Sequence, residues 1–265
     1  MFPLKDSIKI PVAPLVTYLI IAINAAVFLY QTTLSPREAY VFSLRHALVP
    51  LRYFDPTWAA KNGLDPHDYL PLIEGTFMHG GWWHIILNMW TLFIFGSSLE
   101  GRIGKVRFAS FYLVCGILAS VCDACFNRDS DVPTLGASGA IAGILGGYAT
   151  TFPRARITML ILVVFFPLFF RVPALGYAFI WFILQFMQGF VDLVSPSMGT
   201  GIAWWAHIGG FLAGIILIPI FRPVFDPTHD EGAGPLSDIF RWPPQTPKGK
   251  PPSGTPPGWT RGPWG

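Results

Sequence analysis

The sequence predicts an all-α integral membrane protein, a polytopic bundle of six transmembrane helices. Apolar residues make up 52% of the 265 residues and charged residues only 12%, whereas an average soluble domain has about 25% charged residues. The mean hydropathy is +0.48. Several nearly uncharged runs of about 18 residues or more are long enough to cross a bilayer. They should do so as helices, because a helix satisfies its own backbone polar groups in lipid.

Six spans follow from the apolar runs. Five are clear, and they cover 14–31, 77–99, 106–126, 136–153 and 202–221. The stretch before the last span is too long for one upright helix, and Pro167, Arg171 and Pro173 interrupt it. We therefore divide it into an interfacial or re-entrant piece, 157–170, and the remaining span, 172–193. The first piece is short for a hydrocarbon layer of about 30 Å.

Basic residues predict the orientation of the bundle. With the N-terminus inside, most lysines and arginines near the spans fall on the inner side: Lys5, Lys9, Arg102, Lys105, Arg107, Arg154, Arg156 and Arg222. Arg128 is the one basic residue in the short outer loops. This bias predicts that both termini are cytoplasmic. The first apolar run is too long for a signal-peptide core, and no transit-like leader precedes it, so we expect a bacterial inner (plasma) membrane.

Two segments lie outside the spans. The segment 32–75 is too long for a plain loop and rich in aromatic residues, so we expect short amphipathic pieces in the outer interface. The tail, 223–265, holds 11 of the 25 prolines. It should be a disordered cytoplasmic tail, either simply solvated or recruiting a partner protein. We therefore expect a membrane domain over 1–222 followed by this tail.

Charge and cysteine content narrow the classes of function. The net charge of +3 provides no basic face for nucleic acid. The three cysteines, Cys115, Cys122 and Cys125, lie in one apolar segment and cannot form a disulfide framework. Cys122 and Cys125 have CxxC spacing but lack a thioredoxin-like strand–helix context, so packing is the favoured role.

Polar side chains inside the spans mark the candidate site, because they are costly in lipid. They are His84, Asn88, Ser138 and His207. All three spans that carry them run from outside to inside. At 1.5 Å per residue, His84 and His207 lie about 10 Å and about 9 Å below the outer surface. Because the fourth span is short, its outer end, with Ser138, should lie some 8 Å below the outer surface. The polar residues therefore share one layer.

Small residues can bring two of these helices together. They recur every four positions on the fourth and last spans, and such stripes let membrane helices approach closely. The stripes are Gly139, Gly143 and Gly147, and Ala206, Gly210 and Gly214. Because each stripe adjoins its polar residue, a tight crossing would place Ser138 against His207.

This pair has the parts of a serine nucleophile and its base. A neutral histidine takes the proton of a serine hydroxyl near pH 7. No carboxylate lies at the matching depth, so we predict a Ser138–His207 dyad that needs no cofactor. Backbone N–H groups at the start of the fourth helix can bind an oxyanion. His84 and Asn88, on one helix face, add an imidazole and an amide.

A metal site built from His79, His84 and His207 is the competing arrangement. The HExxH signature is absent, and Glu100 lies at the inner end of its span. We therefore predict no metal. His79 is assigned a structural or loop role.

Four motifs resemble those of rhomboid intramembrane serine proteases. They are HGGWWHIILNMW (79–90), LEGRIG (99–104), GASGAIAG (136–143) and AHIGGFLAG (206–214). The resemblance covers about 1–221. It implies a rhomboid-like membrane domain that cleaves transmembrane protein substrates within or near the outer part of the bilayer.

The resemblance also implies residue roles. Ser138 matches the nucleophile and His207 the base. His84, Asn88 and Gly136 match the oxyanion and substrate-binding region, together with the Ser138 backbone N–H. Some members place an aromatic residue four positions after the serine, where this chain has Ala142. Some also have a Trp-Arg pair in the first outer segment, which this chain lacks.

Two other functions remain as alternatives. A catalytically silent rhomboid-like protein would bind membrane clients, although the serine, the histidine and both oxyanion side chains are all present. A transporter or channel would line a path across the bilayer with polar groups, whereas these groups cluster in the outer third.

Overall fold

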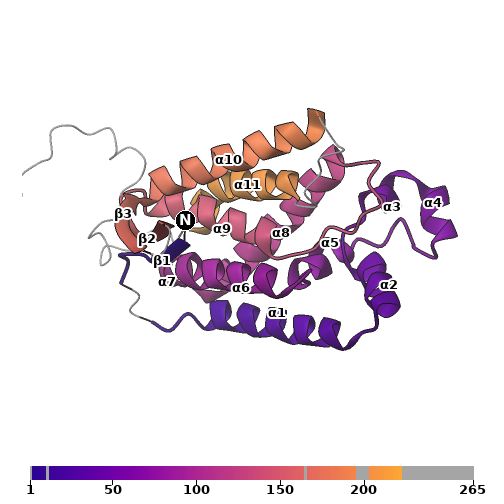
Figure 1. The fold of residues 1–265 in the computed structure, drawn as a ribbon, viewed down its shortest axis with the longest axis horizontal. Helices are drawn as coiled ribbons and strands as arrows, with labels where there is room; N and C mark the ends of the chain where they lie inside the picture. The colour runs from indigo at the N-terminus through magenta and orange to yellow at the C-terminus, as the bar shows by residue number, and fades with distance from the viewer. Residues whose placement is uncertain (1, 10–11, 164–165, 195–202, 223–265) are drawn as a thin grey trace, which may run out of the picture.

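The computed structural model describes residues 2–9, 12–163, 166–194 and 203–222, which form a helical bundle with a small sheet at one end (Figure 1). The predicted tail, 223–265, lies outside the described residues. The bundle helices are α1 (Leu15–Thr33), α6 (Trp82–Thr91), α7 (Ser97–Ile103), α8 (Lys105–Phe126), α9 (Ser138–Thr151), α10 (Ala174–Val194) and α11 (Trp204–Phe221). The strands are β1 (Phe2–Lys5), β2 (Arg156–Val163) and β3 (Phe166–Pro173).

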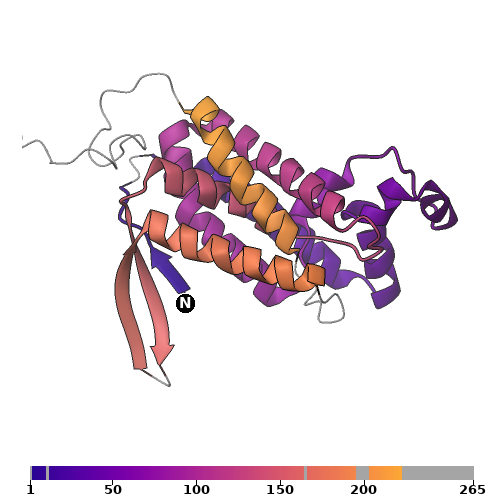
Figure 2. The same ribbon diagram turned by 90° about the horizontal axis from the view of Figure 1, so that it is seen from above.

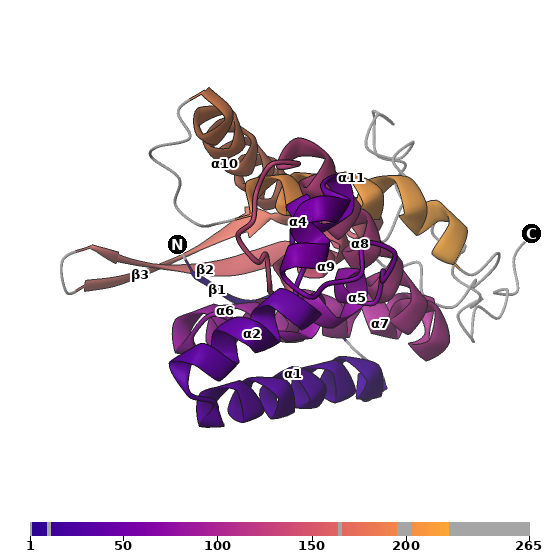
Figure 3. The same cartoon turned by 90° about the vertical axis from the view of Figure 1, so that its right-hand side faces the viewer.

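The mostly helical membrane bundle confirms the predicted fold class. Within the described ranges, α1, α8, α10 and α11 are each long and apolar enough to cross a membrane. The second predicted span consists of α6 and α7, joined by a π-helical stretch, Leu92–Gly96. The fourth is α9, whose 14 residues correspond to about 21 Å of helix. α1 and α10 lie on opposite sides of the bundle (Figures 1 and 3).

α9 occupies the centre of the bundle. Every residue of α9 after Ser138 is buried, which suits a helix built from small and apolar residues. α11 runs parallel to α9 and crosses it through glycine pairs, Gly139 with Gly210 and Gly143 with Gly214. A Cβ added at Gly210 or Gly214 would overlap the carbonyl of its partner. The predicted close crossing is therefore present, and it depends on backbone-to-backbone contact.

The stretch predicted as an interfacial or re-entrant piece, 157–170, forms most of a β-hairpin. β2 pairs antiparallel with β3 from Arg156–Pro173 to Val163–Phe166, and with β1 on its other side. The hairpin projects from the bundle (Figure 2). It adds a sheet that the all-α prediction did not include. In the described part of the chain, α10 is the only helix between this hairpin and α11.

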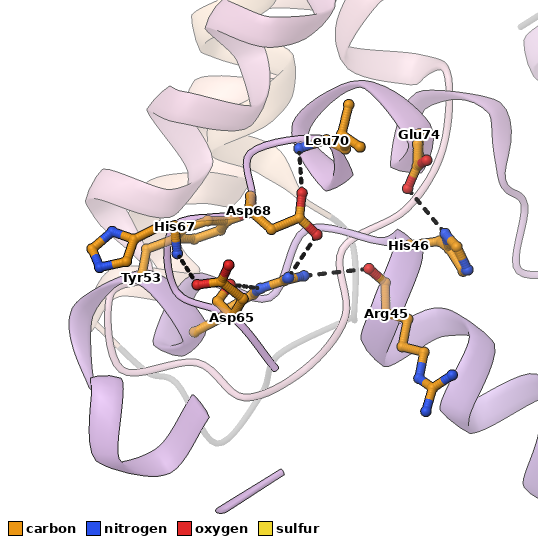
Figure 4. Close-up of polar contacts among 9 residues, drawn as sticks. Arg45, His46, Tyr53, Asp65, His67, Asp68, Leu70 and Glu74 are labelled. Atoms are coloured by element: carbon orange, nitrogen blue, oxygen red, sulfur yellow. Dashed lines mark hydrogen bonds and ion pairs between the residues drawn. The ribbon is translucent and has the colours of Figure 1, made fainter. Parts of the chain in front are cut away.

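The segment 32–75 contains four short helices: α2 (Pro36–His46), α3 (Pro50–Phe54), α4 (Pro56–Lys61) and α5 (Pro71–Glu74). Arg52 is 3% exposed and holds the segment together. It donates to the carbonyls of Arg45 and Asp65 and to the Asp68 carboxylate at 2.9 Å (Figure 4). Its charge is therefore both paired and hydrogen-bonded, as burial demands. The placement of these helices in the outer interface stays a prediction.

Glu100, from the LEGRIG motif, caps a helix other than its own. Its carboxylate accepts from the backbone N–H groups of Val16 at 3.0 Å and Thr17 at 2.7 Å, and from the Thr17 hydroxyl at 2.8 Å. Pro14, the N-cap of α1, provides no side-chain cap. The carboxylate thus satisfies unpaired N–H groups at the positive end of the α1 dipole.

Asp6, just after β1, connects the N-terminal strand to the bundle through hydrogen bonds. Its Oδ2 accepts from the Ser98 hydroxyl at 2.6 Å and from the Tyr148 hydroxyl at 2.9 Å. Ser98 belongs to α7 and Tyr148 to α9. Burial raises the pKa of Asp6 above its ordinary value, although these hydrogen bonds oppose the shift.

Candidate active site

Ser138 is the first residue of α9. The chain reaches it through Gly136, whose φ of +128° is a backbone conformation that favours glycine. This turn is anchored to the end of the segment 32–75, because the Gly136 N–H donates to the Gly75 carbonyl at 2.9 Å. No side chain caps the start of α9. The serine therefore sits partly buried beside the uncapped N–H groups of a helix N-terminus.

His207 lies against this serine. Its Nε2 is 2.8 Å from the Ser138 Oγ, within the range of about 2.6–3.2 Å that direct proton transfer needs. The parallel crossing of α9 and α11 produces this contact, because Ser138 and His207 precede Gly139 and Gly210 by one and three residues. The contact predicted from the shared depth of the two residues is therefore present.

Gln185 is a site residue that the sequence analysis missed. Its Oε1 lies 2.7 Å from the Nδ1 of His207. We predicted a dyad because no carboxylate lies at the matching depth, whereas Gln185 is a neutral amide in the predicted span 172–193. The available signal was that Gln185 is one of the few polar side chains in a mostly apolar run.

Two tryptophans flank the histidine ring. The ring centroid of His207 lies 5.9 Å from that of Trp181 on α10 and 6.1 Å from that of Trp204 on α11. Ala142 leaves no aromatic ring four positions after the serine. The aromatic neighbours of His207 thus come from α10 and α11.

His84 and Asn88 face the turn before the serine. A Cβ added at Gly136 would lie 2.8 Å from the His84 ring and 3.8 Å from the Asn88 Nδ2. The same Asn88 Nδ2 atom lies 3.0 Å from the His79 Nε2. Since an amide nitrogen carries two hydrogens, this bond leaves one N–H of Asn88 for another acceptor. All five predicted site residues therefore gather at the start of α9.

A comparison with known families identifies the family of the chain. A family model described as the Rhomboid domain matches residues 66–224, which is more than half of the chain. The chain belongs to the rhomboid family. The match includes every residue of the site.

Several curated relatives resemble this rhomboid. Rhomboid protein 1, mitochondrial, of Saccharomyces cerevisiae is 29% identical over 56% of this chain and 40% of its own length. Presenilin-associated rhomboid-like protein, mitochondrial, of Mus musculus is 33% identical over 55% of this chain and 35% of its own length. RHOMBOID-like protein 4 of Arabidopsis thaliana is 31% identical over 57% of this chain and 34% of its own length. The chain thus spans less than half the length of these relatives.

The relatives also bear on where this rhomboid resides. The family match and the long apolar helices both indicate that this is an integral membrane protein. Two of the three relatives are named as mitochondrial, which does not fit the bacterial inner membrane that we expected.

The space beside the serine of this rhomboid is small. A cavity of about 20 Å³ borders Ser138 and Gly136, enough for roughly one water molecule. Two larger cavities, of about 370 Å³ and 330 Å³, lie beside β1 and between α1 and α2. Ser138 lines the small cavity, and its contact with His207, rather than the size of a cavity, marks the candidate site.

Proposed function

We propose that this rhomboid is an intramembrane serine endopeptidase that cleaves transmembrane protein substrates within or near the outer part of the bilayer. The observation that carries the proposal is the 2.8 Å contact between the Ser138 Oγ and the His207 Nε2. A serine becomes a nucleophile when such a base takes its proton. A silent client-binding protein has no need of this contact.

The first step forms an acyl-enzyme. His207 Nε2 takes the proton of the Ser138 hydroxyl while the Oγ bonds to the carbonyl carbon of the scissile peptide. The carbonyl oxygen becomes an oxyanion. When the C–N bond breaks, the imidazolium returns its proton to the leaving nitrogen.

The second step releases the acyl group. A water molecule gives a proton to His207 and attacks the ester carbonyl carbon. Collapse of the second tetrahedral intermediate breaks the bond to Oγ, and the proton returns to the serine. The products are a carboxylic acid and the free enzyme.

The oxyanion is stabilised by groups at the start of α9. The backbone N–H of Ser138 and the positive end of the helix dipole lie there. The Asn88 amide and the His84 ring face the same turn from α6. Donors fixed in advance stabilise developing charge strongly where water is excluded.

Cleavage of a generic single-span protein by the purified full-length chain tests this function. We expect cleavage by the wild type and none by Ser138→Ala. Ser110→Ala is the matched control, because Ser110 is an exposed serine on α8, and it should cleave normally. A fluorophosphonate should label Ser138 only when His207 is intact.

The same assay separates the alternatives. Cleavage that persists in Ser138→Ala would contradict the proposed nucleophile. A folded wild type that neither cleaves substrates nor reacts with the fluorophosphonate would point to the silent client-binding protein.

A further inference from the structure

We propose that Gln185 is a positioning residue, which holds the His207 imidazole in the tautomer and orientation that accept the Ser138 proton. This inference rests on the proposed proteolytic function and adds a third member to the site. The observation behind it is a continuous chain of polar contacts. Ser138 Oγ lies 2.8 Å from His207 Nε2, and His207 Nδ1 lies 2.7 Å from Gln185 Oε1.

The chemistry of the amide oxygen selects the tautomer. A carbonyl oxygen only accepts hydrogen bonds, so the ring nitrogen that faces it must carry the proton. The proton therefore sits on Nδ1 of His207, and Nε2 presents its lone pair to Ser138. The opposite tautomer would place an N–H against the serine and remove the base.

The rest of the ring's surroundings cannot make this choice. Trp181 and Trp204 restrict the ring by packing at 5.9 Å and 6.1 Å between centroids. Ring contacts of this kind, one tilted and one edge-on, supply no hydrogen-bond acceptor that would distinguish the two nitrogens of the imidazole. Among the hydrogen bonds of the described residues, the bond to Gln185 is the one that engages Nδ1.

An amide suits this position better than the carboxylate of a soluble triad. Gln185 is only partly buried, and its neighbours Leu184 and Phe186 are 56% and 46% exposed on a helix long and apolar enough to span a membrane. A fixed negative charge on such a surface is costly in lipid. A neutral carbonyl provides the acceptor without that charge.

Gln185→Met tests the proposal, because methionine keeps the length of the side chain and loses the strong acceptor. Gln188→Met is the matched control, since Gln188 lies one turn away on α10 with its side chain exposed. For Gln185→Met we expect kcat to fall on the order of 10- to 100-fold, by analogy with the residues that orient metal-ligating histidines, with KM unchanged. Gln188→Met should retain both constants.

A second readout is independent of proteolysis. In ¹⁵N-histidine-labelled full-length protein, the ring shifts of His207, assigned by their absence in His207→Ala, report its tautomer. We expect the Nδ1–H form in the wild type and in Gln188→Met, and a mixture of tautomers in Gln185→Met. Gln185→Glu, which retains an acceptor oxygen, should restore the Nδ1–H form.

The outcomes separate this proposal from the proposed function. An inactive wild type would refute the proteolytic function, while the ring shifts would still test the role of Gln185. Ring shifts or a kcat left unchanged by Gln185→Met would overturn the proposal. Equal losses of kcat in Gln185→Met and Gln188→Met would also overturn it, because they would indicate general packing of α10.

Discussion

Asn88 shows how much one side chain at the site depends on another. Its amide nitrogen is bonded to the His79 Nε2, and the His79 backbone N–H in turn donates to the Gln31 Oε1 at 3.0 Å. This chain of contacts links α6 to the end of α1. His79, expected to have a structural role, therefore fixes the direction in which the second amide N–H of Asn88 points.

Loss of the Asn88 amide should slow catalysis without weakening substrate binding. We expect Asn88→Ala to lower kcat by about 10²–10³, the usual cost of removing one oxyanion donor, with little change in KM. His79→Leu should produce part of this loss. Because both changes act through one amide, the double variant should be no slower than Asn88→Ala. Steady-state kinetics decide the point, and a raised KM with normal kcat would make Asn88 a binding residue.

The site residues differ in how readily the sequence revealed them. Ser138 and His207 could be paired because helical rise and span boundaries placed them at one depth. Gln185 could not be paired in this way, since the sequence does not distinguish it from Gln188 on the same run until the helices are packed. The two tryptophans beside His207 were hidden for the same reason, because aromatic residues are common throughout the spans.

At the level of elements, the crossing of α9 and α11 sets the distance between nucleophile and base. Gly214→Ala places a Cβ against the Gly143 carbonyl, and the helices must separate. We expect a loss of about 1–3 kcal/mol in the free energy of unfolding, as for other overpacked sites. Activity should fall as well, because the dyad lies on the same crossing.

Gly176→Ala is the control for this prediction. A Cβ at Gly176 would meet only the Pro173 ring at 3.4 Å, which is ordinary contact. The free energy of unfolding of Gly176→Ala should therefore be nearly that of the wild type. Unfolding in a detergent titration measures both variants, and equal stability of the two would refute the importance of the crossing.

The hairpin of β2 and β3 was not predictable by the same reasoning as the helices. Its apolar run resembles a short membrane segment, and no Asn-Gly or Asp-Gly turn marks a two-residue hairpin loop. The third strand of the sheet, β1, pairs Phe2 with Leu160, which are far apart in the sequence. Such distant pairing leaves no local pattern in the sequence.

For the whole molecule, the site depends on topology. α9 and α11 must run in the same direction, or the serine and histidine would lie at opposite faces of the bilayer. The hairpin replaces an extra crossing and leaves α10 as the one described helix that returns the chain. One helix at this place is what the single crossing predicted from the break at Arg171 requires, and the crossing itself stays a prediction.

Cysteine labelling tests this topology in a membrane. In a background without Cys115, Cys122 and Cys125, we expect Arg171→Cys to react with a membrane-impermeant thiol reagent only from the inner side. Thr57→Cys, on exposed α4, should react from the outer side. Labelling of both positions from one side would contradict the topology and, with it, the proposed mechanism.

Asp6 makes the stability of the whole fold depend on pH. Because burial raises its pKa in the folded state above the ordinary 3.8, folding favours the protonated form. The resulting stabilisation is full below about pH 3.8 and is lost as the pH rises through the folded-state pKa. Asp6→Asn should therefore flatten the difference in unfolding free energy between about pH 4 and neutral pH. A steeper dependence in this variant would reverse the assigned direction.

The hydrogen-bonded chain from Ser138 through His207 to Gln185 contains no fixed charge when the imidazole is neutral. In the proposed reaction an imidazolium and an oxyanion arise together and disappear together, so the site has no net charge at any stage. Dissolved ions screen the interaction between two charges when these lie farther apart than about a Debye length, roughly 10 Å at 0.1 M salt. The two transient charges lie far closer than that. Once substrate is bound, the rate of the chemical step should therefore be almost independent of ionic strength.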